Sequence, residues 1–224
     1  MGKIFCGGKI VKQKTLLFDF DGVLVDSMPY WGRKMLNILD TYHVDYPPDI
    51  LKTLATKGDL GSARYFQEEF GVPLSIEEML AMMDTYALPR YRDEIPAKEG
   101  VADYLRSRRA AGDSLNVLTA SPHKMLDPCL KRLGLYDLFD HVWSTDDFGL
   151  PKTDPEIYRL AARQLGEAEK DVVFFDDNIN AIRTAAEAGM FTVGVFDESG
   201  EEYTEEMRTA ADRYIRSFTE PDEE

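Results

Sequence analysis

The stretch FDFDGVLVDS, residues 18–27, follows a short apolar run and decides the fold. Side chains of a strand alternate between its two faces, so Asp19 and Asp21 point the same way at the carboxyl end of a predicted strand. Gly22 permits a tight turn directly afterwards, which leaves both acids in a crevice. Two adjacent acids suit a hard cation and a nucleophile, because an aspartate can attack phosphorus or carbon while its neighbour moves the proton. The alternative is that both acids merely end a strand in an ordinary turn.

Hydroxyl residues end a second predicted strand, in NVLTASP, residues 116–122. Thr119 is suited to bond a phosphate oxygen at this position. Ser121 is predicted to be the N-cap of the helix that follows, with Pro122 in the first turn. Because the amino end of a helix attracts anions, we expect this helix to face the same crevice as Asp19. The alternative is that Thr119 and Ser121 only cap a helix.

A lysine and a further pair of acids follow two more predicted strands. Lys152 lies in the turn-rich loop GLPKTDP, residues 149–155, where open α/β sheets place ligand groups, although a single lysine means little by itself. The apolar strand in VVFFDDN, residues 172–178, stops abruptly in Asp176 and Asp177. Acids at the tip of a buried parallel strand indicate the edge of the sheet where cations bind.

We expect Asp176 to complete a magnesium site with Asp19. Asp177 is expected to lie behind it, where it orients the ligands or holds Lys152. In this order, the four segments resemble the motifs of the haloacid dehalogenase superfamily, in the phosphoglycolate phosphatase and beta-phosphoglucomutase-like branch that carries a helical cap. The resemblance covers residues 15–196 and includes the helix after the last acid pair.

The resemblance implies a role for each of these side chains. Asp19 is the nucleophile that forms an aspartyl phosphate, Asp21 is the general acid and base, and Mg²⁺ binds Asp19, the carbonyl of Asp21 and Asp176. The phosphoryl group is bound by residues of the second and third motifs, namely Thr119, Ala120, Ser121 and Lys152. A cation, a lysine and backbone amides suit the negative charge of a phosphoryl transition state. Many relatives carry a further aspartate where this chain has Asn180, so Asn180 is expected to have only a supporting part beside Asp177.

The order of predicted elements is a strand, a long helical insert, and then alternating helices and strands. This order predicts an α/β fold, with a doubly wound, Rossmann-like parallel sheet as core and an inserted all-helical cap. Residues 1–25 and 93–224 are expected to form the core, and residues 26–92 the cap. Core strands are predicted at residues 15–20, 115–119, 141–144, 172–175 and 192–195, with an edge strand at 213–217. Core helices are predicted at residues 100–111, 122–133, 155–165, 178–188 and 202–211.

The insert contains amphipathic segments without a convincing strand. Cap helices are predicted at residues 27–42, 48–56, 60–70 and 75–86, with a return linker at 89–96. Trp31 and Met35 recur at helical spacing with other apolar residues, which indicates a cap core. In the family that the chain resembles, the cap largely decides substrate choice, and Lys57 and Arg64 are the candidates here. The alternative for Lys57 is a turn between helices in which Asp59 is an N-cap.

Composition limits the class of protein. The 224 residues carry a net charge of −15, which argues against nucleic-acid binding because phosphate backbones need a basic surface. No apolar run approaches the length of a membrane span, so no membrane partner is expected. Two cysteines are too few for a disulfide framework, so we expect a cytoplasmic protein. A monomer or weak homodimer is a separate expectation. The histidines, His43, His123 and His141, lack metal-ligand spacing.

The leading hypothesis is a magnesium-dependent phosphatase that acts on a small phosphorylated metabolite. A sugar phosphomutase, which would return the phosphoryl group to bound substrate, is the nearest alternative. A 2-haloacid dehalogenase is disfavoured, because that branch attacks carbon without magnesium. Two non-enzymes complete the set: a signalling receiver domain, disfavoured by the order of the motifs, and a silent phosphate-binding relative, disfavoured by four chemically competent motifs.

Overall fold

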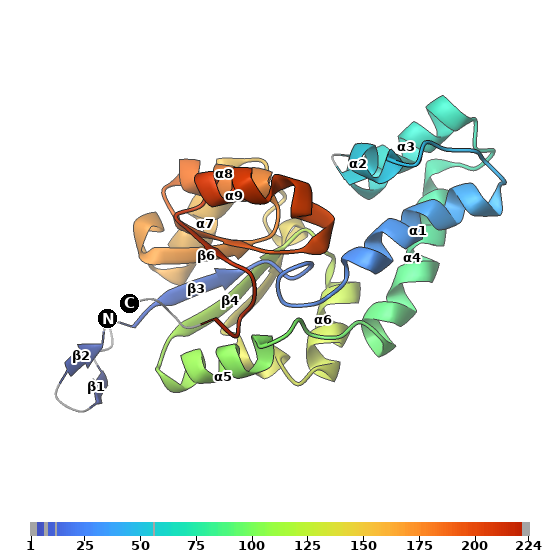
Figure 1. The fold of residues 1–224 in the computed structure, drawn as a ribbon. Helices are drawn as coiled ribbons and strands as arrows, with labels where there is room; N and C mark the ends of the chain where they lie inside the picture. Colours follow the sequence, from blue (N-terminus) through green and yellow to red (C-terminus); the bar gives the residue numbers. More distant parts are fainter. Residues whose placement is uncertain (1–3, 7–8, 12, 56, 221–224) are drawn as a thin grey trace. The chain divides into compact units, whose positions relative to one another are not determined.

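The apolar runs form a six-stranded parallel sheet with the strand order β5-β4-β3-β6-β7-β8 (Figure 1). The computed structural model describes residues 4–6, 9–11, 13–55 and 57–220. The strands of this sheet are β3 (Thr15–Phe18), β4 (Ser114–Thr119), β5 (His141–Ser144), β6 (Val172–Asp176), β7 (Phe191–Val195) and β8 (Arg213–Ile215). Each strand pairs parallel with its neighbours, which confirms the predicted α/β class.

The centre of the sheet determines where ligands can bind. β3 pairs with β4 on one side and with β6 on the other, so that Phe18 lies opposite both Val117 and Phe175. The chain winds outwards from β3 to β4 and β5, and then in the opposite direction to β6, β7 and β8. In open α/β sheets the carboxyl ends of the strands beside such a reversal form the ligand crevice.

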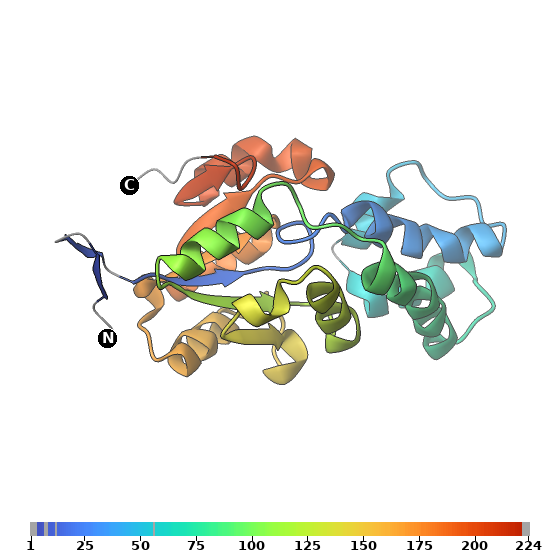
Figure 2. The ribbon, with the colours of Figure 1, turned by 90° about the horizontal axis from the view of Figure 1, so that it is seen from below.

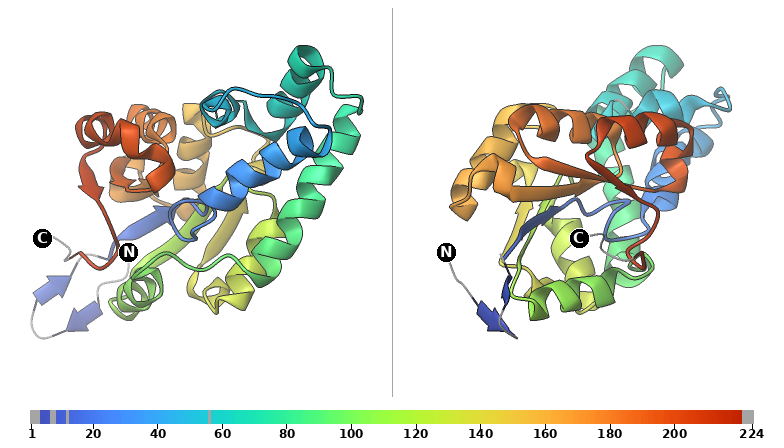
Figure 3. Two further views of the ribbon diagram at one scale, coloured as in Figure 1. Left: turned by 45° about the vertical axis from the view of Figure 1, so that its right-hand side comes forward. Right: turned by 60° about the vertical axis from the view of Figure 1, so that its left-hand side comes forward.

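Helices cover both faces of the sheet, as Figures 2 and 3 show. In Figure 1, α5 and α6 lie below the sheet, while α7, α8 and α9 lie above it. These helices are α5 (Val101–Ala110), α6 (His123–Arg132), α7 (Pro155–Leu165), α8 (Ile179–Ala188) and α9 (Thr204–Ala210). Short 3-10 helices are η1 (Tyr136–Leu138), η2 (Thr145–Asp147), η3 (Glu169–Asp171) and η4 (Glu198–Tyr203). Tyr158 of α7 and Ile182 of α8 pack against Leu17 and Phe174 of the sheet. Coverage of both faces explains why the central strands read as continuous apolar runs.

The chain divides into two compact units, Met1–Asp26 with Ile95–Glu224, and Ser27–Glu94. The described residues of the second unit form α1 (Met28–Thr41), α2 (Ile50–Ala55), α3 (Gly58–Phe70) and α4 (Ile76–Asp93). These helices have a hydrophobic core of their own, which includes Met35 and Met79 with Trp31 packed against it. The apolar spacing of this segment therefore serves helix packing.

Helix α4 is longer than the periodicity predicts. Residues 75–86 were the expected helix and residue 89 the start of a linker, whereas α4 continues to Asp93 with Pro89 inside it. Proline lacks an N–H and removes one hydrogen bond from a helix. Arg90 reinforces the same turn, because its guanidinium donates to the carbonyl of Tyr86 at 2.5 Å and lies over the Tyr86 ring. The expected boundary after residue 92 consequently falls inside α4.

Two further segments differ from expectation. An antiparallel hairpin of β1 (Ile4–Cys6) and β2 (Lys9–Val11) precedes the sheet, where the sequence predicts no strand. β3 ends at Phe18, two residues before its predicted end, and the chain bends at Phe20. Within the part of the chain that the structure describes, we find no helix of the length and apolarity that a membrane span requires.

Candidate active site

The tips of three neighbouring strands bring together residues that are distant in sequence. Asp19 directly follows β3, Thr119 ends β4 and Asp176 ends β6. The Asp19 N–H donates to the carbonyl of Phe175 at 2.8 Å, which extends the pairing of β3 with β6 by one residue. The side chains of Asp19, Thr119 and Asp176 are all buried. The first, second and fourth predicted motifs thus meet at one edge of the sheet.

Lys152 lies between two of these acids. Its Nζ is 2.6 Å from Oδ1 of Asp19 and 2.8 Å from Oδ2 of Asp176. The carbonyl of Lys152 accepts a hydrogen bond of 3.2 Å from the hydroxyl of Tyr158 in α7, which fixes the loop at the lysine itself. The ammonium donates a charge-assisted hydrogen bond to Asp176, which is stronger than a neutral one, and forms an ion pair with Asp19.

Asp177 completes a cluster of three carboxylates. Asp19, Asp176 and Asp177 each offer an oxygen within 4.8 Å of the others. The N–H of Asn178 donates to Oδ1 of Asp176 at 2.7 Å, so both oxygens of Asp176 have a hydrogen-bond partner. Gly22 packs against Asp177 with φ +70°, and a Cβ at this position would lie 2.3 Å from Oδ2 of Asp177. Only glycine fits so close an approach.

The clustered charges shift the pKa values of the site. Burial, together with the charges of Asp176 and Asp21, raises the pKa of Asp19 to about 7 against the opposing effect of Lys152. Burial and the charges of Asp176 and Asp19 also raise the pKa of Asp177 well above its usual value. Burial opposes the charge of Lys152, but Asp176 and Asp19 outweigh it and raise the pKa of the ammonium. The site therefore favours additional positive charge, and its all-oxygen donors are the ligand type that Mg²⁺ prefers.

Ser121 binds Asp21 rather than the start of a helix. Its hydroxyl donates to Oδ2 of Asp21, and its N–H donates to the hydroxyl oxygen of Thr119 at 3.1 Å. The N-cap of α6 is Pro122, with no side-chain cap, so the prediction that Ser121 caps this helix is wrong. The reason is that a bond from a hydroxyl to a carboxylate is stronger than one to a neutral backbone group. Ala120, between the two hydroxyl residues, is exposed.

The remaining predicted residues lie outside the carboxylate cluster. Asn180 is exposed in the first turn of α8, and its N–H donates to Oδ1 of Asn178 at 2.9 Å. Asn180 therefore takes part in the N-terminal capping of α8 by Asn178, the residue that follows the acid pair. Lys57 and Arg64 are exposed residues of the helical unit, and Nζ of Lys57 lies 4.9 Å from the centre of the Tyr65 ring.

Asp59 pairs with a lysine and does not cap a helix. α3 begins at Gly58 and has Lys57 in the N-cap position, so the alternative in which Asp59 is the N-cap is wrong. The carboxylate of Asp59 lies 2.8 Å from Nζ of the buried Lys34 in α1. An ion pair to a buried ammonium is worth more than a cap on an exposed turn, and it joins α1 to α3 within their unit.

Two residues contribute to the site without a motif of their own. Tyr158 follows the apolar spacing of α7, yet its hydroxyl reaches the Lys152 carbonyl. Lys98 lies in the segment between α4 and α5, and its ammonium donates to the carbonyl of Gly22 at 2.7 Å. The sequence hints at Lys98 only through a basic residue in a short connection that returns to the sheet.

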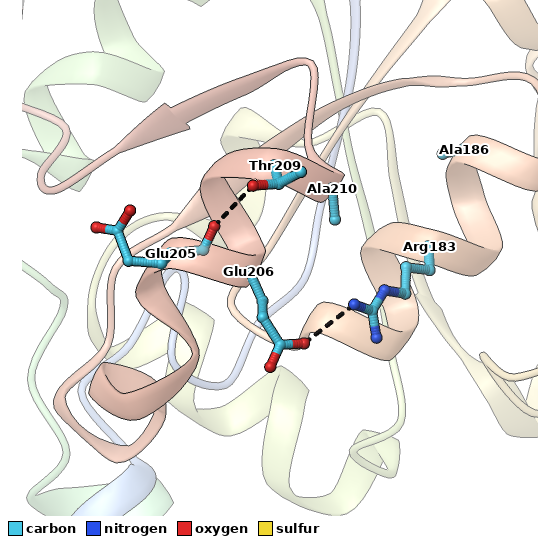
Figure 4. Close-up of a pocket in the computed structure, with 6 residues that line it drawn as sticks. All are labelled: Arg183, Ala186, Glu205, Glu206, Thr209 and Ala210. Carbon is cyan, nitrogen blue, oxygen red and sulfur yellow. Dashed lines mark hydrogen bonds and ion pairs between the residues drawn. The ribbon is translucent and has the colours of Figure 1, made fainter.

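A separate surface hollow of about 610 Å³ lies between α8 and α9 (Figure 4). Its lining consists of Arg183, Ala186, Glu205, Glu206, Thr209 and Ala210. The charged groups that reach across it bind each other, because the guanidinium of Arg183 lies 3.1 Å from the carboxylate of Glu206. None of the clustered acids lines this hollow, so it has no part in their chemistry.

Comparison with protein families assigns the chain to a known family. The sequence model of haloacid dehalogenase-like hydrolases matches residues 13–189, which is most of the chain. The chain belongs to this family. The resemblance that the four motifs carry is thereby confirmed, and the protein is an enzyme of the hydrolase type.

Individual relatives of this haloacid dehalogenase-like hydrolase match over most of their length. YhcW of Bacillus subtilis, provisionally named a phosphatase, is 29% identical over 79% of this chain and 80% of its own. Hexitol phosphatase B of Escherichia coli is 25% identical over 91% of this chain and 92% of its own. A variant of CbbY from Rhodobacter sphaeroides, solved with xylulose-(1,5)bisphosphate, has a TM-score of 0.79 at 24% identity and covers 93% of this chain and 96% of its own. This structural likeness shows the shared fold.

Replacement of Gly22 is expected to disturb the carboxylate cluster. In Gly22→Ala the new Cβ must displace the Asp177 carboxylate, and φ +70° adds backbone strain. The free energy of unfolding is therefore expected to fall by about 2–4 kcal/mol. Gly134→Ala is the matched control, because Gly134 has φ +67° but open space around its Cβ position, and it should lose only about 1 kcal/mol. Urea denaturation measures both. Equal losses for the two variants would contradict the close approach.

His123 provides a pH-dependent contact between α6 and η2. Its Nδ1 lies 2.9 Å from Oδ1 of Asp127, and its Nε2 lies 2.9 Å from Oδ2 of Asp147. The bonds to Asp127 and to Asp147 raise the pKa of His123 above its usual value of 6.5. The folded state therefore favours the protonated ring. This stabilisation is complete below the unfolded pKa and is lost as the pH rises through the higher folded pKa.

His123→Gln is accordingly expected to destabilise the protein at about pH 5.5 and not at about pH 9. The side chain is 41% exposed, so solvent screening limits the loss to less than about 1 kcal/mol. Urea denaturation of wild type and variant at the two pH values measures the difference. A larger loss at the higher pH would show that the sign of the linkage is wrong.

Proposed function

We propose that this hydrolase is a magnesium-dependent phosphatase that acts on a small phosphorylated metabolite through an aspartyl phosphate on Asp19. The observation that carries the proposal is Asp19 itself, at the tip of the central strand with Lys152 2.6 Å away and two further carboxylates beside it. Relatives that match over most of their length and are named as phosphatases support the choice of a phosphate ester as substrate.

The contacts of the acid pair lead us to exchange the roles expected from the sequence. Asp176 uses one oxygen for Lys152 and the other for the N–H of Asn178. Among the residues that the structure describes, no lysine forms an ion pair with Asp177, which lies in the same cluster as Asp19. We therefore infer that Asp19, Asp177 and the main-chain carbonyl of Asp21 hold Mg²⁺, while Asp176 holds Lys152. The ion, when bound, neutralises charge on the acids and on the phosphoryl oxygens.

The proposed first step is an attack of Oδ2 of Asp19 on phosphorus. Lys152 holds Oδ1 of Asp19, which leaves the second oxygen for the attack. The bond from phosphorus to the ester oxygen breaks, and Asp21 gives a proton to the leaving oxygen. Ser121 holds the carboxyl of Asp21 through its hydroxyl, which restricts where that proton is delivered.

The proposed second step is hydrolysis of the aspartyl phosphate. Asp21, now ionised, takes a proton from water as the water oxygen attacks phosphorus. The bond from phosphorus to Oδ2 of Asp19 breaks, which releases inorganic phosphate and restores the carboxylate. The hydroxyl of Thr119 accepts from Ser121 and keeps its own hydrogen for a phosphoryl oxygen, with the N–H of Ala120 beside it. Lys152 stabilises the negative charge that spreads over these oxygens.

Substrate selection is proposed to reside in the helical unit Ser27–Glu94. Lys57 and Arg64 remain the candidates, because both carry an exposed cation that suits an anionic or hydroxyl-rich substrate. A cytoplasmic location, the absence of nucleic-acid and membrane partners, and a monomer or weak homodimer also remain predictions from the sequence.

Turnover of phosphate esters tests the proposal. With Mg²⁺, the protein is expected to release inorganic phosphate steadily from p-nitrophenyl phosphate and from a panel of sugar phosphates and phosphoglycolate. Asp19→Asn keeps the shape of the side chain but removes the nucleophile, so kcat should fall about a thousandfold or more. Asp137→Asn, on an exposed acid of η1, is the control and should retain full activity. Turnover no faster than that of Asp19→Asn would reject the proposed phosphatase activity.

The same assay separates the phosphatase from the phosphomutase alternative. A phosphatase releases one phosphate for each substrate molecule consumed. A mutase converts one sugar phosphate into an isomer, with phosphate release that stops after a small fraction of the substrate. Nuclear magnetic resonance of the sugar products together with phosphate release distinguishes the two outcomes.

Binding of Mg²⁺ to single variants tests the exchanged roles of the acid pair. Calorimetry on the metal-free protein is expected to show that Asp177→Asn weakens Mg²⁺ binding about tenfold or more, because a direct ligand is lost. Asp176→Asn is expected to weaken it by less and to lower kcat through the release of Lys152. The reverse order of affinities would restore the assignment expected from the sequence.

A further inference from the structure

Lys98 is a nearly buried cation that none of the four motifs includes. Its side chain is 18% exposed. A lysine ammonium has three N–H donors, and those of Lys98 reach the carbonyl of Gly22 at 2.7 Å, the carbonyl of Phe196 at 2.6 Å and Oδ2 of Asp197 at 3.0 Å. Every donor thus has an acceptor, and two of the three acceptors are main-chain carbonyls.

These acceptors belong to two segments at the active-site edge of the sheet. Gly22 directly follows Asp21 in the turn after β3. Phe196 and Asp197 directly follow β7. The other oxygen of Asp197 accepts from the N–H and the hydroxyl of Ser199, at 3.0 and 2.7 Å. Asp197 is therefore fixed by its own loop, and Lys98 ties the turn after β3 to a rigid partner.

Main-chain hydrogen bonds around Lys98 also hold the turn after β3. The N–H of Lys98 donates to the carbonyl of Leu24 at 3.1 Å, and the N–H of Asp26 donates to the carbonyl of Pro96 at 3.0 Å. Val25 and Ala97 form an isolated bridge between these contacts. Residues 96–98, which follow the helical unit in sequence, thus run alongside residues 24–26.

The turn that Lys98 holds carries one acid and packs on another. Gly22 lies so close to Asp177 that a Cβ would come within 2.3 Å of Oδ2. A shift of the Gly22 carbonyl therefore moves the backbone of Asp21 and changes the space available to Asp177.

We propose that Lys98 is a positioning residue for the reaction. Its ammonium fixes the carbonyl of Gly22, and this contact holds in place the turn that carries Asp21 beside the carboxylate cluster. The inference rests on the proposed function. Lys98 acts through the backbone of the turn, because its ammonium bonds the carbonyl of Gly22. The metal affinity and the catalytic rate of the site consequently depend on a lysine outside the motifs.

A purely structural lysine would behave differently from a positioning residue. Its loss would lower the stability of the whole sheet unit and leave the metal affinity of the folded protein unchanged. Loss of a positioning residue loosens the turn itself, lowers kcat and weakens Mg²⁺ binding while the protein remains folded. Hydrogen exchange of the turn, Mg²⁺ affinity and kcat therefore separate the two roles.

Lys98→Met is the test variant, because methionine keeps an unbranched chain without the ammonium. Lys170→Met, on an exposed lysine of η3 at the opposite end of β6, is the matched control. In the metal-free protein, backbone hydrogen exchange of residues 20–25 is expected to rise at least about tenfold in Lys98→Met and not in the control. Mg²⁺ should bind about tenfold more weakly, and kcat should fall between about tenfold and a hundredfold with KM within about threefold of wild type.

Chemical restoration of the ammonium tests whether the charge itself is required. Lys98→Cys, alkylated with 2-bromoethylamine, carries a side chain of nearly the length of lysine that ends in an ammonium. This treatment is expected to restore the exchange rate and kcat, with alkylated wild type as the reference for modification elsewhere. Asp197→Asn retains both carbonyl contacts of Lys98 and is expected to show a smaller change than Lys98→Met. If Lys98→Met does not fold, the cysteine variant before and after alkylation and Asp197→Asn decide the question.

The outcomes distinguish failure of this inference from failure of the proposed function. An active wild type with Lys98→Met equal to Lys170→Met in hydrogen exchange, Mg²⁺ affinity and kcat would overturn the role of Lys98 alone. Complete alkylation without recovery would do the same. A wild type without turnover on any phosphate ester would overturn the proposed function, whereas hydrogen exchange of residues 20–25 still reports whether Lys98 holds the turn.

Discussion

The ammonium of Lys152 between Asp19 and Asp176 is the interaction on which the rest of the site depends. Three carboxylates with oxygens within 4.8 Å repel one another, and burial adds to the cost of their charges. In the proposed mechanism Asp19 must be ionised to attack phosphorus, yet burial raises its pKa to about 7 even with Lys152 beside it. The proposed chemistry therefore requires positive charge at this edge of the sheet, which Lys152 supplies in part and a bound Mg²⁺ would complete.

The parallel sheet explains how residues so distant in sequence meet. β3 lies between β4 and β6, so the residues that follow or end these strands share one edge. The bond from the Asp19 N–H to the Phe175 carbonyl aligns the first acid with the strand that ends in Asp176. The strands that lead to this edge are apolar and buried, and the polar side chains of the site begin only where the strands end. The fold thus separates a rigid apolar support from a small charged surface at its tip.

The acids at the strand ends were predictable, because a buried parallel strand is a continuous apolar run in the sequence. The acidic residues that directly follow such a run lie at the carboxyl end of the strand. The role of Ser121 was not, since an N-cap and a bond to Asp21 have the same local sequence and differ only in the direction of the hydroxyl. The roles proposed for Asp176 and Asp177 depend likewise on which oxygen bonds Lys152. Lys98 had only the weak signal of a basic residue in a short connection, because its three acceptors come from segments 76 to 99 residues away.

Reductive trapping of the intermediate tests the central claim most directly. Protein that is turning over a phosphate ester in the presence of Mg²⁺ is quenched and treated with borohydride, which reduces an aspartyl phosphate to homoserine. Mass spectrometry of the peptide that contains Asp19 and Asp21 then locates the modified residue. The account predicts homoserine at position 19, only after exposure to substrate and not in Asp19→Asn. Homoserine at position 21, or steady phosphate release without any homoserine, would contradict it.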